Sequence, residues 1–430
     1  MTTQPVIQER YKSDHLFLLV GTNPLPNFVA ATLMLRSQGQ LYLVHSDKTK
    51  AVAERLACYW TATKQQPQPQ FVCVDESDGA NIRQHINNAL AKIRNGQIGL
   101  NYTGGTKTMA VHATRAMLGY QERNHRPVTL SYLDARSNRM YIEHDNDTAC
   151  MTEPLLYEVQ PSIQDIVKLH AFELVSGIET QAILPDLAAT LATLHQNDSA
   201  GREWRAWCDT VLRRQTRNEK GWCKEAELSN ARLQVPINDS LKPFIDALTQ
   251  KGVIVQNGEI AIQQAYSSLG LTKGKYLCEW LDGKWLEHYV FHTLQQIKNS
   301  ETHIHDIGMG IRPKSEPNSP EYDIDIGVMQ GYRLYAISCT TDADLGMCKL
   351  KLFEAYVRAR NMAGDEAFVG LICMTDKPEN LERQVGRAWD AEGKVRVFGR
   401  KHLSYLANDL ADWFISAGAQ NKEQRIWSRK

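Results

Sequence analysis

The segment Ile98–Leu118, IGLNYTGGTKTMAVHATRAML, constrains the fold of this chain more than any other stretch. Its apolar start predicts a short strand, the Thr-Gly-Gly-Thr run predicts a tight turn, and the residues from Lys107 onward predict a helix. Gly104 and Gly105 let the backbone bend and approach a ligand closely, and the new helix presents its unpaired N–H groups. The pattern therefore predicts a phosphate-binding turn at the end of a strand.

This turn is neither of two familiar nucleotide-binding loops. The Walker A spacing Gly-x-x-x-x-Gly-Lys is absent from it, so nucleoside triphosphate hydrolysis is not implied, and the dinucleotide fingerprint is absent as well. Strand-to-helix turns with two glycines also occur in ordinary α/β packing. A ligand site here is therefore a hypothesis that needs a second observation.

A similar turn near the N-terminus supplies that observation. His15–Val20 is an apolar run typical of a buried strand, and the polar turn Gly21–Asn27 leads into an apolar helix over Phe28–Leu35. In an open parallel sheet, ligands bind at the carboxyl edge, where the strand order reverses. We expect both turns to lie at this edge.

Strands and helices alternate between His15 and Ile142, as they do in a parallel sheet covered by helices. After the first strand, strands are predicted at Leu41–Val44, Phe71–Val74, Ile98–Tyr102, Val128–Leu133 and Arg139–Ile142, with helices at Ala51–Thr63 and Asn81–Ile93. We therefore predict an α/β fold whose first domain, residues 1–160, is Rossmann-like.

Length and composition limit the classes of protein to which this chain can belong. The chain has 430 residues, of which 43% are hydrophobic and 23% charged, enough for two or three domains. Lys plus Arg and Asp plus Glu number 49 each, so any polyanion must be met by local patches. The sequence shows no signal peptide and no membrane-spanning stretch, so we expect a cytoplasmic protein without membrane partners. Nine cysteines without a Cys-x-x-Cys pair favour reduced thiols.

Residues 161–270 are predicted to form a helical, winged-helix-like linker domain. Ala182–Leu194 is apolar at helical spacing, Arg202–Trp207 is basic and aromatic, and a helix over Leu241–Lys251 precedes a two-stranded wing over Val253–Ile262. Because no cluster of lysines and arginines marks a recognition helix, a structural role is favoured over DNA binding.

Residues 271–430 predict a third unit with the element order αβββαβ. Helices are expected at Tyr276–Ile297 and Cys348–Met362, and strands at Tyr322–Met329, Arg333–Cys339 and Ala367–Cys373, with one further strand between His303 and Ile311. Gln330-Gly331-Tyr332, between two apolar alternating runs, predicts a β-hairpin.

This unit can assemble the groups that metal-dependent phosphodiester cleavage needs, namely carboxylates that hold a divalent cation and a lysine near the phosphate. Asp323 and Asp325 alternate on one predicted strand, so we expect their side chains to share a face. Each residue alone also fits a solvated surface position, and their combination in one unit favours a site. The candidate catalytic residues are Glu287, Asp323, Asp325, Lys349, Lys351 and Glu354.

The two turns, the linker and the αβββαβ unit together resemble the CARF (CRISPR-associated Rossmann fold) effectors of type III CRISPR systems that carry a C-terminal PD-(D/E)xK, or restriction-endonuclease-like, nuclease domain. The resemblance covers nearly the whole chain. It implies a homodimer whose CARF domains bind a cyclic oligoadenylate, most often cyclic tetra-adenylate, and thereby activate metal-dependent cutting of nucleic acid, DNA or RNA. The ligand contacts it implies are Gly21, Thr22, Asn23, Pro24, Thr103, Gly104, Gly105, Thr106 and Lys107.

The nuclease half departs from the family pattern. Asp325 matches the family's metal-binding aspartate, but where the (D/E)xK tripeptide should follow, the chain reads Ser338-Cys339-Thr340. Either the missing charges have moved to the next helix, or the domain only senses the ligand and signals to a partner. We expect the first, with Mg²⁺ or Mn²⁺ held by Glu287, Asp323 and Asp325. In a third hypothesis the first domain slowly cleaves its own ligand.

Overall fold

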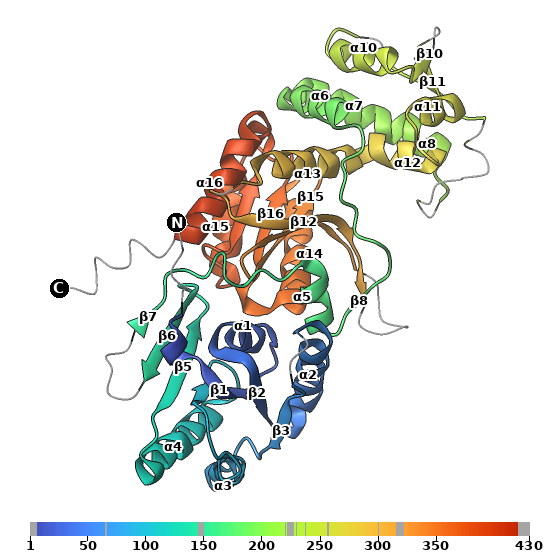
Figure 1. The fold of residues 1–430 in the computed structure, drawn as a ribbon. Helices are drawn as coiled ribbons and strands as arrows, with labels where there is room; N and C mark the ends of the chain where they lie inside the picture. The colour runs from blue at the N-terminus through green and yellow to red at the C-terminus, as the bar shows by residue number, and fades with distance from the viewer. Residues whose placement is uncertain are drawn as a thin grey trace, which may run out of the picture.

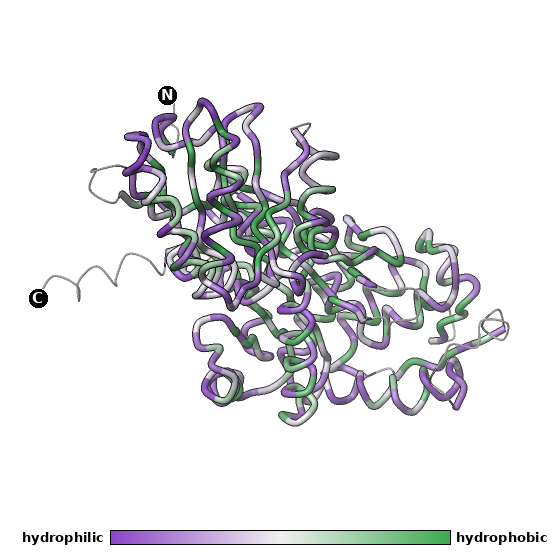
Figure 2. Tube along the Cα trace, turned by 90° about the horizontal axis from the view of Figure 1, so that it is seen from below, coloured by the Kyte–Doolittle hydropathy of each residue, from purple (hydrophilic) through white to green (hydrophobic). Residues whose placement is uncertain are grey.

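The computed structural model describes residues 7–64, 67–144, 150–219, 221, 228, 230–236, 238–255, 258–299, 301–314 and 322–419. Two sheets, one from each half of the chain, lie next to each other, and a mostly helical unit projects from the C-terminal sheet on the side away from the N-terminal sheet (Figure 1). Hydrophobic segments gather inside the trace and hydrophilic ones at its periphery (Figure 2). The predicted α/β fold class is confirmed.

Seven strands form the N-terminal sheet, in the order β3-β2-β1-β4-β5-β6-β7. Their bounds are β1 (Ser13–Leu19), β2 (Leu35–His45), β3 (Gln70–Cys73), β4 (Ile98–Asn101), β5 (Val128–Asp134), β6 (Arg139–His144) and β7 (Cys150–Met151). The strands from β1 to β5 pair in parallel, whereas β6 and β7 pair antiparallel. The predicted strand at 139–142 exists, but it returns as a hairpin and does not extend the parallel set.

Helices cover both faces of this sheet, as the alternation predicted. They are α1 (Leu25–Met34), α2 (Lys50–Lys64), α3 (Gly79–Leu90) and α4 (Lys107–Asn124). Leu16 and Leu18 of β1 pack in one core with α1 and α2, and Phe17 and Leu19 pack in another with α3 and α4. A central parallel strand is buried on both faces, which is why the first strand is continuously apolar. Each such side chain contributes about 1.5–3 kcal/mol on full burial.

The projecting unit is mostly helical, with α6 (Pro185–Gln196), α7 (Asp198–Trp207), α8 (Arg213–Thr216), α10 (Lys242–Gln250), α11 (Ile262–Ser268) and α12 (Gly274–Glu279). Its sheet has three strands, β10 (Ile254–Val255), β11 (Glu259–Ala261) and β9 (Arg232–Gln234). The predicted two-stranded wing therefore gains a third strand, which pairs Leu233 with Ile260 across a long sequence separation. None of the described helices is both long and apolar enough to cross a membrane.

Five strands form the C-terminal sheet, in the order β12-β14-β15-β16-β17. They are β12 (Ile304–Ile311), β14 (Ile324–Gln330), β15 (Arg333–Cys339), β16 (Phe368–Ile372) and β17 (Val395–Phe398). The first three pair antiparallel and the last three in parallel. Because α13 (Trp285–Ile297) precedes β12 and α14 (Leu345–Ala363) joins β15 to β16, the predicted αβββαβ order is confirmed. Two further helices, α15 (Pro378–Ala388) and α16 (Leu406–Ala419), and a ribbon of β8 (Glu173–Leu174) and β13 (Pro313–Lys314) complete the unit.

The single helix predicted at Tyr276–Ile297 is divided. After α12, a π-helical turn covers Trp280–Lys284 before α13 begins. Gly283 in this turn has backbone angles outside the helical region, φ 173° and ψ −25°, which interrupts the regular hydrogen-bond ladder. The interruption places Lys284 directly before α13, three residues ahead of Glu287.

β14 and β15 are joined by the predicted tight turn. Gln330 pairs with Arg333, and Gly331 between them has φ +57°, a conformation that glycine adopts without steric cost. A side chain at Gly331 would lie 3.0 Å from the carbonyl oxygen of Leu155. The hairpin therefore packs closely against the segment that follows the N-terminal sheet.

One apolar core extends through both sheets. α5 (Ile163–Leu169) contributes Ile163, Ile166, Val167 and Leu169 to a core that also contains residues of β1, α1, α2, β14, β15 and α14. The domain bounds 1–160, 161–270 and 271–430 stay predictions. The apolar core contains residues from both sides of position 160. α5 joins the two sheets and is not the first helix of a separate linker.

Candidate functional site

The two turns predicted to bind a ligand lie side by side. β1 and β4 are neighbours in the sheet, with β2 on the other side of β1, so the strand order reverses here. A Cβ added to Gly21 would lie 3.2 Å from the backbone nitrogen of Gly105, and one added to Gly104 would lie 3.1 Å from the backbone nitrogen of Gly21. The predicted position of both turns, at the carboxyl edge of the sheet where its order reverses, is confirmed.

Glycine is required at two positions of the second turn, for different reasons. A Cβ on Gly104 would lie 2.2 Å from the carbonyl oxygen of Leu19, which no side chain tolerates. Gly105 has φ +73°, a left-handed conformation that is strained for other residues. The turn is therefore shaped by close approach of backbone to backbone.

The two threonines of this turn stabilise its conformation through hydrogen bonds. Thr103 Oγ1 accepts a hydrogen bond from the backbone N–H of Leu133 at 2.7 Å. Thr106 caps α4 by accepting from the N–H of Met109 at 3.2 Å, and its hydroxyl donates to the carbonyl of Glu76 at 3.3 Å. Both were predicted to offer hydroxyls to a ligand. In the structure the Thr106 hydroxyl both donates and accepts a hydrogen bond, whereas the Thr103 hydroxyl accepts one and can still donate its proton.

Three of the predicted ligand residues face solvent at this edge. Thr22, Gly105 and Lys107 are exposed, and Lys107 is the first residue of α4. Helix N-termini attract anions because their first N–H groups lack helical partners. The exposed part of the site thus combines one lysine, one hydroxyl and the positive end of α4.

Asn23 and Pro24 differ from their predicted role. Asn23 Nδ2 donates to Glu366 Oε2 at 2.9 Å, and its Oδ1 accepts from the backbone N–H of Leu25 at 3.0 Å and lies 3.2 Å from His170 Nε2. Pro24 is buried at the start of α1. Glu366 follows α14 and His170 ends α5, so the side chain of Asn23 joins the first turn to the C-terminal unit and does not face the open edge.

Sequence reasoning missed a second cation at the same edge. Lys48 Nζ lies 2.6 Å from Glu76 Oε1, and Ser46 Oγ donates to Glu76 Oε2 at 2.8 Å. These hydrogen bonds, that from Lys48 first, lower the pKa of Glu76. Glu76 also receives the Thr106 hydroxyl at its carbonyl. The sequence signal for Lys48 and Glu76 was that polar residues follow β2 and β3. Those strands end at the same edge of the sheet as β1 and β4.

Two half-buried carboxylates, Glu287 of α13 and Asp325 of β14, define a candidate site in the C-terminal unit, here called the carboxylate pocket. Burial, and then the charge of Asp325, raise the pKa of Glu287 well above its ordinary value. Asp325 Oδ2 accepts hydrogen bonds from Cys339 N–H at 2.7 Å and Ser338 Oγ at 3.0 Å. Burial raises the pKa of Asp325, against the lowering effect of the Cys339 hydrogen bond. Two such groups favour a positive ion between them.

Asp323 is placed less favourably than predicted. β14 begins at Ile324, and Asp323, just before it, turns toward Arg312, with its Oδ2 3.8 Å from Arg312 Nε. Its carbonyl accepts from Arg358 at 2.8 Å, while its Oδ1 is buried and has no hydrogen-bond partner among the residues that the structure describes. Over the described ranges, no three His, Cys, Asp or Glu side chains converge closely enough to hold a metal ion. Of the three residues predicted to hold the metal ion, Glu287 and Asp325 interact with each other, and Asp323 lies next to them.

Positive charge reaches the pocket from two helices. Lys284, which the sequence analysis missed, precedes α13. Although burial lowers its pKa, the carboxylates of Glu287 and Glu279 outweigh this effect and raise it. On α14, Lys351 lowers the pKa of Asp325. The sequence signal for Lys284 was its spacing from Glu287, because residues three positions apart lie on the same face of a helix.

The other charges predicted on α14 have different positions. Glu354 lies between Lys351 and Arg358, at 4.0 and 3.5 Å, and is neutralised by them. Lys349 is exposed and, two residues before Lys351, lies about 200° around the helix from it. The hypothesis that charge moved to α14 therefore fits Lys351 and not Lys349.

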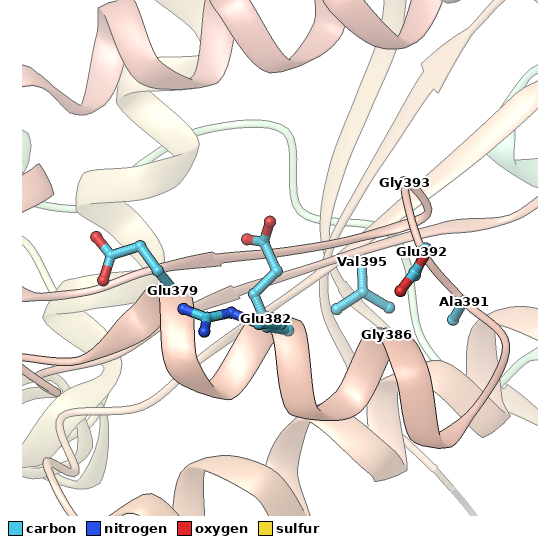
Figure 3. Close-up of a pocket in the computed structure, with 8 residues that line it drawn as sticks. Glu379, Glu382, Gly386, Ala391, Glu392, Gly393 and Val395 are labelled. Carbon is cyan, nitrogen blue, oxygen red and sulfur yellow. The ribbon is translucent and has the colours of Figure 1, made fainter.

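A hollow on the outside of the C-terminal unit is separate from this pocket. It lies between α15 and the turn before β17, where Glu379, Glu382 and Glu392 line it (Figure 3). Glu382 is engaged by the N–H of Val397 at 2.9 Å and by Arg396 at 3.3 Å. Arg383 also lines the hollow, and Glu392 lies 3.9 Å from Arg387, so arginines offset part of its negative charge.

The fold defines a class of protein in which a doubly wound sheet and a mixed αβββαβ sheet share one chain. Among solved structures, protein VC1899 from Vibrio cholerae aligns with TM-score 0.70 and 16% identity, over 94% of this chain and 99% of that one. Can2 from Sulfobacillus thermosulfidooxidans, solved in complex with cyclic tetra-adenylate, aligns with TM-score 0.65 and 18% identity, over 93% and 99%. The chain therefore has their fold. No protein-family model matches the sequence, and no curated protein is significantly similar to it.

Proposed function

We propose that this protein is a nuclease switched on by a cyclic oligoadenylate, acting in type III CRISPR defence. The observation that carries the proposal is the Glu287–Asp325 pair, two half-buried carboxylates whose pKa values are both raised, on the same chain as a sheet edge with the N-terminus of α4 and Lys107. Two neighbouring half-buried carboxylates raise each other's pKa and destabilise a protein, so a cation that binds between them, beside Lys284 and Lys351, best explains the pair. The likeness to Can2, which was solved with cyclic tetra-adenylate, supports the sensor half.

The sensor half would bind the ring at the carboxyl edge of the N-terminal sheet. Thr22, Gly105, Lys107 and the N-terminus of α4 would face its phosphates, and Lys48, which pairs with Glu76, lies at the next strand end. A homodimer would offer two such edges to one ring and double the positive charge. The chain's neutral overall charge makes this local arrangement necessary.

The nuclease half would use Glu287 and Asp325 to hold Mg²⁺ or Mn²⁺, with Asp323 in reach through its buried free oxygen. A divalent ion would polarise the phosphate of a DNA or RNA strand. Lys284 and Lys351 would steady the charge that develops on that phosphate, in place of the lysine missing at Thr340. Ser338 orients Asp325 through its hydrogen bond.

A cleavage assay with purified protein tests the proposal. We expect cyclic tetra-adenylate with Mn²⁺ to start cutting of labelled single-stranded DNA, RNA or plasmid, and Asp325→Ala to abolish cutting while calorimetry shows unchanged affinity for the ring. Loss of a metal ligand should cost more than the roughly 10- to 100-fold that outer-shell changes cost. Unchanged cutting by Asp325→Ala would refute the assignment of the pocket.

A sensor without nuclease activity is the second candidate. Two observations favour it, the tripeptide Ser338-Cys339-Thr340 in place of an acidic residue and a lysine, and the lack of a three-ligand metal group in the described residues. In that case the ring would bind with the same affinity, and no nucleic acid would be cut under any metal condition. Binding without cutting on every substrate separates this candidate from the nuclease.

A further inference from the structure

α14 presents an apolar stripe to solvent next to the carboxylate pocket. Leu350, Phe353 and Val357 are 50%, 47% and 40% exposed, and their spacing of three and four places them on one side of the helix. The opposite side, with Leu352 and Ala359, is fully buried. Surface helices normally carry polar residues on the outer side, so this stripe is suited to contact a partner.

Aromatic rings extend this stripe sideways. The Phe353 ring lies 5.4 Å from the ring of Trp389, and the Tyr356 ring lies 5.2 Å from it. The guanidinium of Arg360 lies over the Tyr356 ring at 5.4 Å. Phe353 is the most exposed ring of this group, so a flat ligand group can stack on it.

α14 carries more cations than carboxylates, although Glu354 pairs with Lys351 and Arg358, and Asp365 pairs with Arg360. α14 carries Lys349, Lys351, Arg358 and Arg360 but only one carboxylate, Glu354, although the whole chain has 49 charges of each sign. Lys351 and Arg358 lie on the side toward Asp325 and Asp323, where Arg358 donates to the Asp323 carbonyl. Lys349 and Arg360 lie on the other side. Cations therefore border the apolar stripe on both sides.

We propose that this stripe binds a single strand of nucleic acid and leads it into the pocket, an inference that rests on the proposed nuclease function. Stacking of bases on exposed aromatic rings, beside cations that follow the phosphates, is how proteins bind single strands without sequence preference. A duplex hides its bases from such a ring.

A second copy of the chain fits this surface less well. Two-fold pairing of α14 with its own copy in an antiparallel arrangement brings the same flank of both helices together. Lys349 and Arg360 of one copy would then face the same two cations of the other. This repulsion favours a polyanion as the occupant.

Fluorescence anisotropy tests the track without cleavage. Labelled single-stranded oligonucleotides are titrated with full-length protein in EDTA, with and without cyclic tetra-adenylate, against a duplex of equal length. We expect preference for the single strand and roughly 5- to 100-fold weaker binding by Phe353→Ala, the effect of one lost stacked base. Phe353→Leu should bind as weakly, whereas Phe353→Trp should retain binding. Leu118→Ala on α4, whose side chain is 42% exposed, is the matched control and should bind as the wild type does.

The outcomes separate this inference from the proposed function. Binding that depends on Phe353 but leads to no cleavage with metal would overturn the nuclease and keep the track. Cleavage by a protein whose binding is unaffected by Phe353→Ala would overturn the track alone. Light scattering that shows Phe353→Ala dissociating a dimer, with binding unchanged, would assign the stripe to a second copy.

Discussion

The turns at the edge of the N-terminal sheet and the pocket of the C-terminal sheet are built in opposite ways. The turns are shaped by their backbone, because Gly21 and Gly104 are in contact. The threonine hydroxyls form hydrogen bonds within the N-terminal unit. The pocket consists of long side chains from three separate elements, Glu287, Asp325 and Lys351. A backbone site depends on a short stretch of sequence. A site made of side chains can lose a charged residue of a local motif, because a charged side chain from another helix can occupy the same position.

The largest expected effect breaks the backbone site. Gly104→Ala places a Cβ 2.2 Å from the Leu19 carbonyl oxygen, so the turn must shift. We expect affinity for cyclic tetra-adenylate to fall roughly 10- to 100-fold, as misplacement by about 1 Å does elsewhere, and the free energy of unfolding to fall by about 1–3 kcal/mol. Calorimetry and urea denaturation measure the two.

Gly119→Ala is the matched control for that experiment, since its Cβ on α4 would meet only the end of the Arg123 side chain, at 3.1 Å. It should bind the ring normally and gain up to about 1 kcal/mol of stability. Normal binding by Gly104→Ala would mean that the turn does not contact the ring.

The next effect concerns the link between the two regions. Asn23→Ala removes the hydrogen bonds to Glu366 and the contact with His170. We expect ligand affinity to stay within about twofold while the ratio of cleavage rates with and without ligand falls about 5-fold or more, the usual size of an allosteric coupling. Glu366→Gln keeps an acceptor for Asn23 and should retain activation. Equal activation by Asn23→Ala and the wild type would place the coupling elsewhere.

The smallest effect concerns the stability of the pocket without metal. The folded state raises the pKa of Glu287, so this carboxyl supports folding below its ordinary pKa, and that support is lost as the pH rises through the raised value. Glu287→Gln should therefore stabilise the protein near neutral pH by roughly 0.5–2 kcal/mol, a common gain when a functional group is replaced. Near pH 4 the difference should vanish.

Denaturant unfolding in EDTA at several pH values measures this difference. Adding Mn²⁺ should stabilise the wild type and not the variant, because only the wild type keeps both carboxylates for the ion. The same stability difference at every pH would show that Glu287 is not held in the environment described above.

The sequence predicted the two turns at the edge of the N-terminal sheet better than the carboxylate pocket. Apolar runs flanked by glycine turns are local signals, and they located both turns, the hairpin at Gly331 and the αβββαβ order. The direction of the Asn23 side chain depends on Glu366, far along the chain, and no local pattern contains that contact. Lys284 was missed because the missing positive charge was sought on the helix after β15, where Lys349 and Lys351 lie, and not on the helix of Glu287. β9 was missed because its partner strand is remote in the sequence.

The core that α5 shares with both sheets has a consequence for how such proteins diversify. Because the same buried leucines and isoleucines support both sheets, neither half can be exchanged for an unrelated one without changes in this core. A recombinant chimera joined near residue 160 would expose the apolar side of α5.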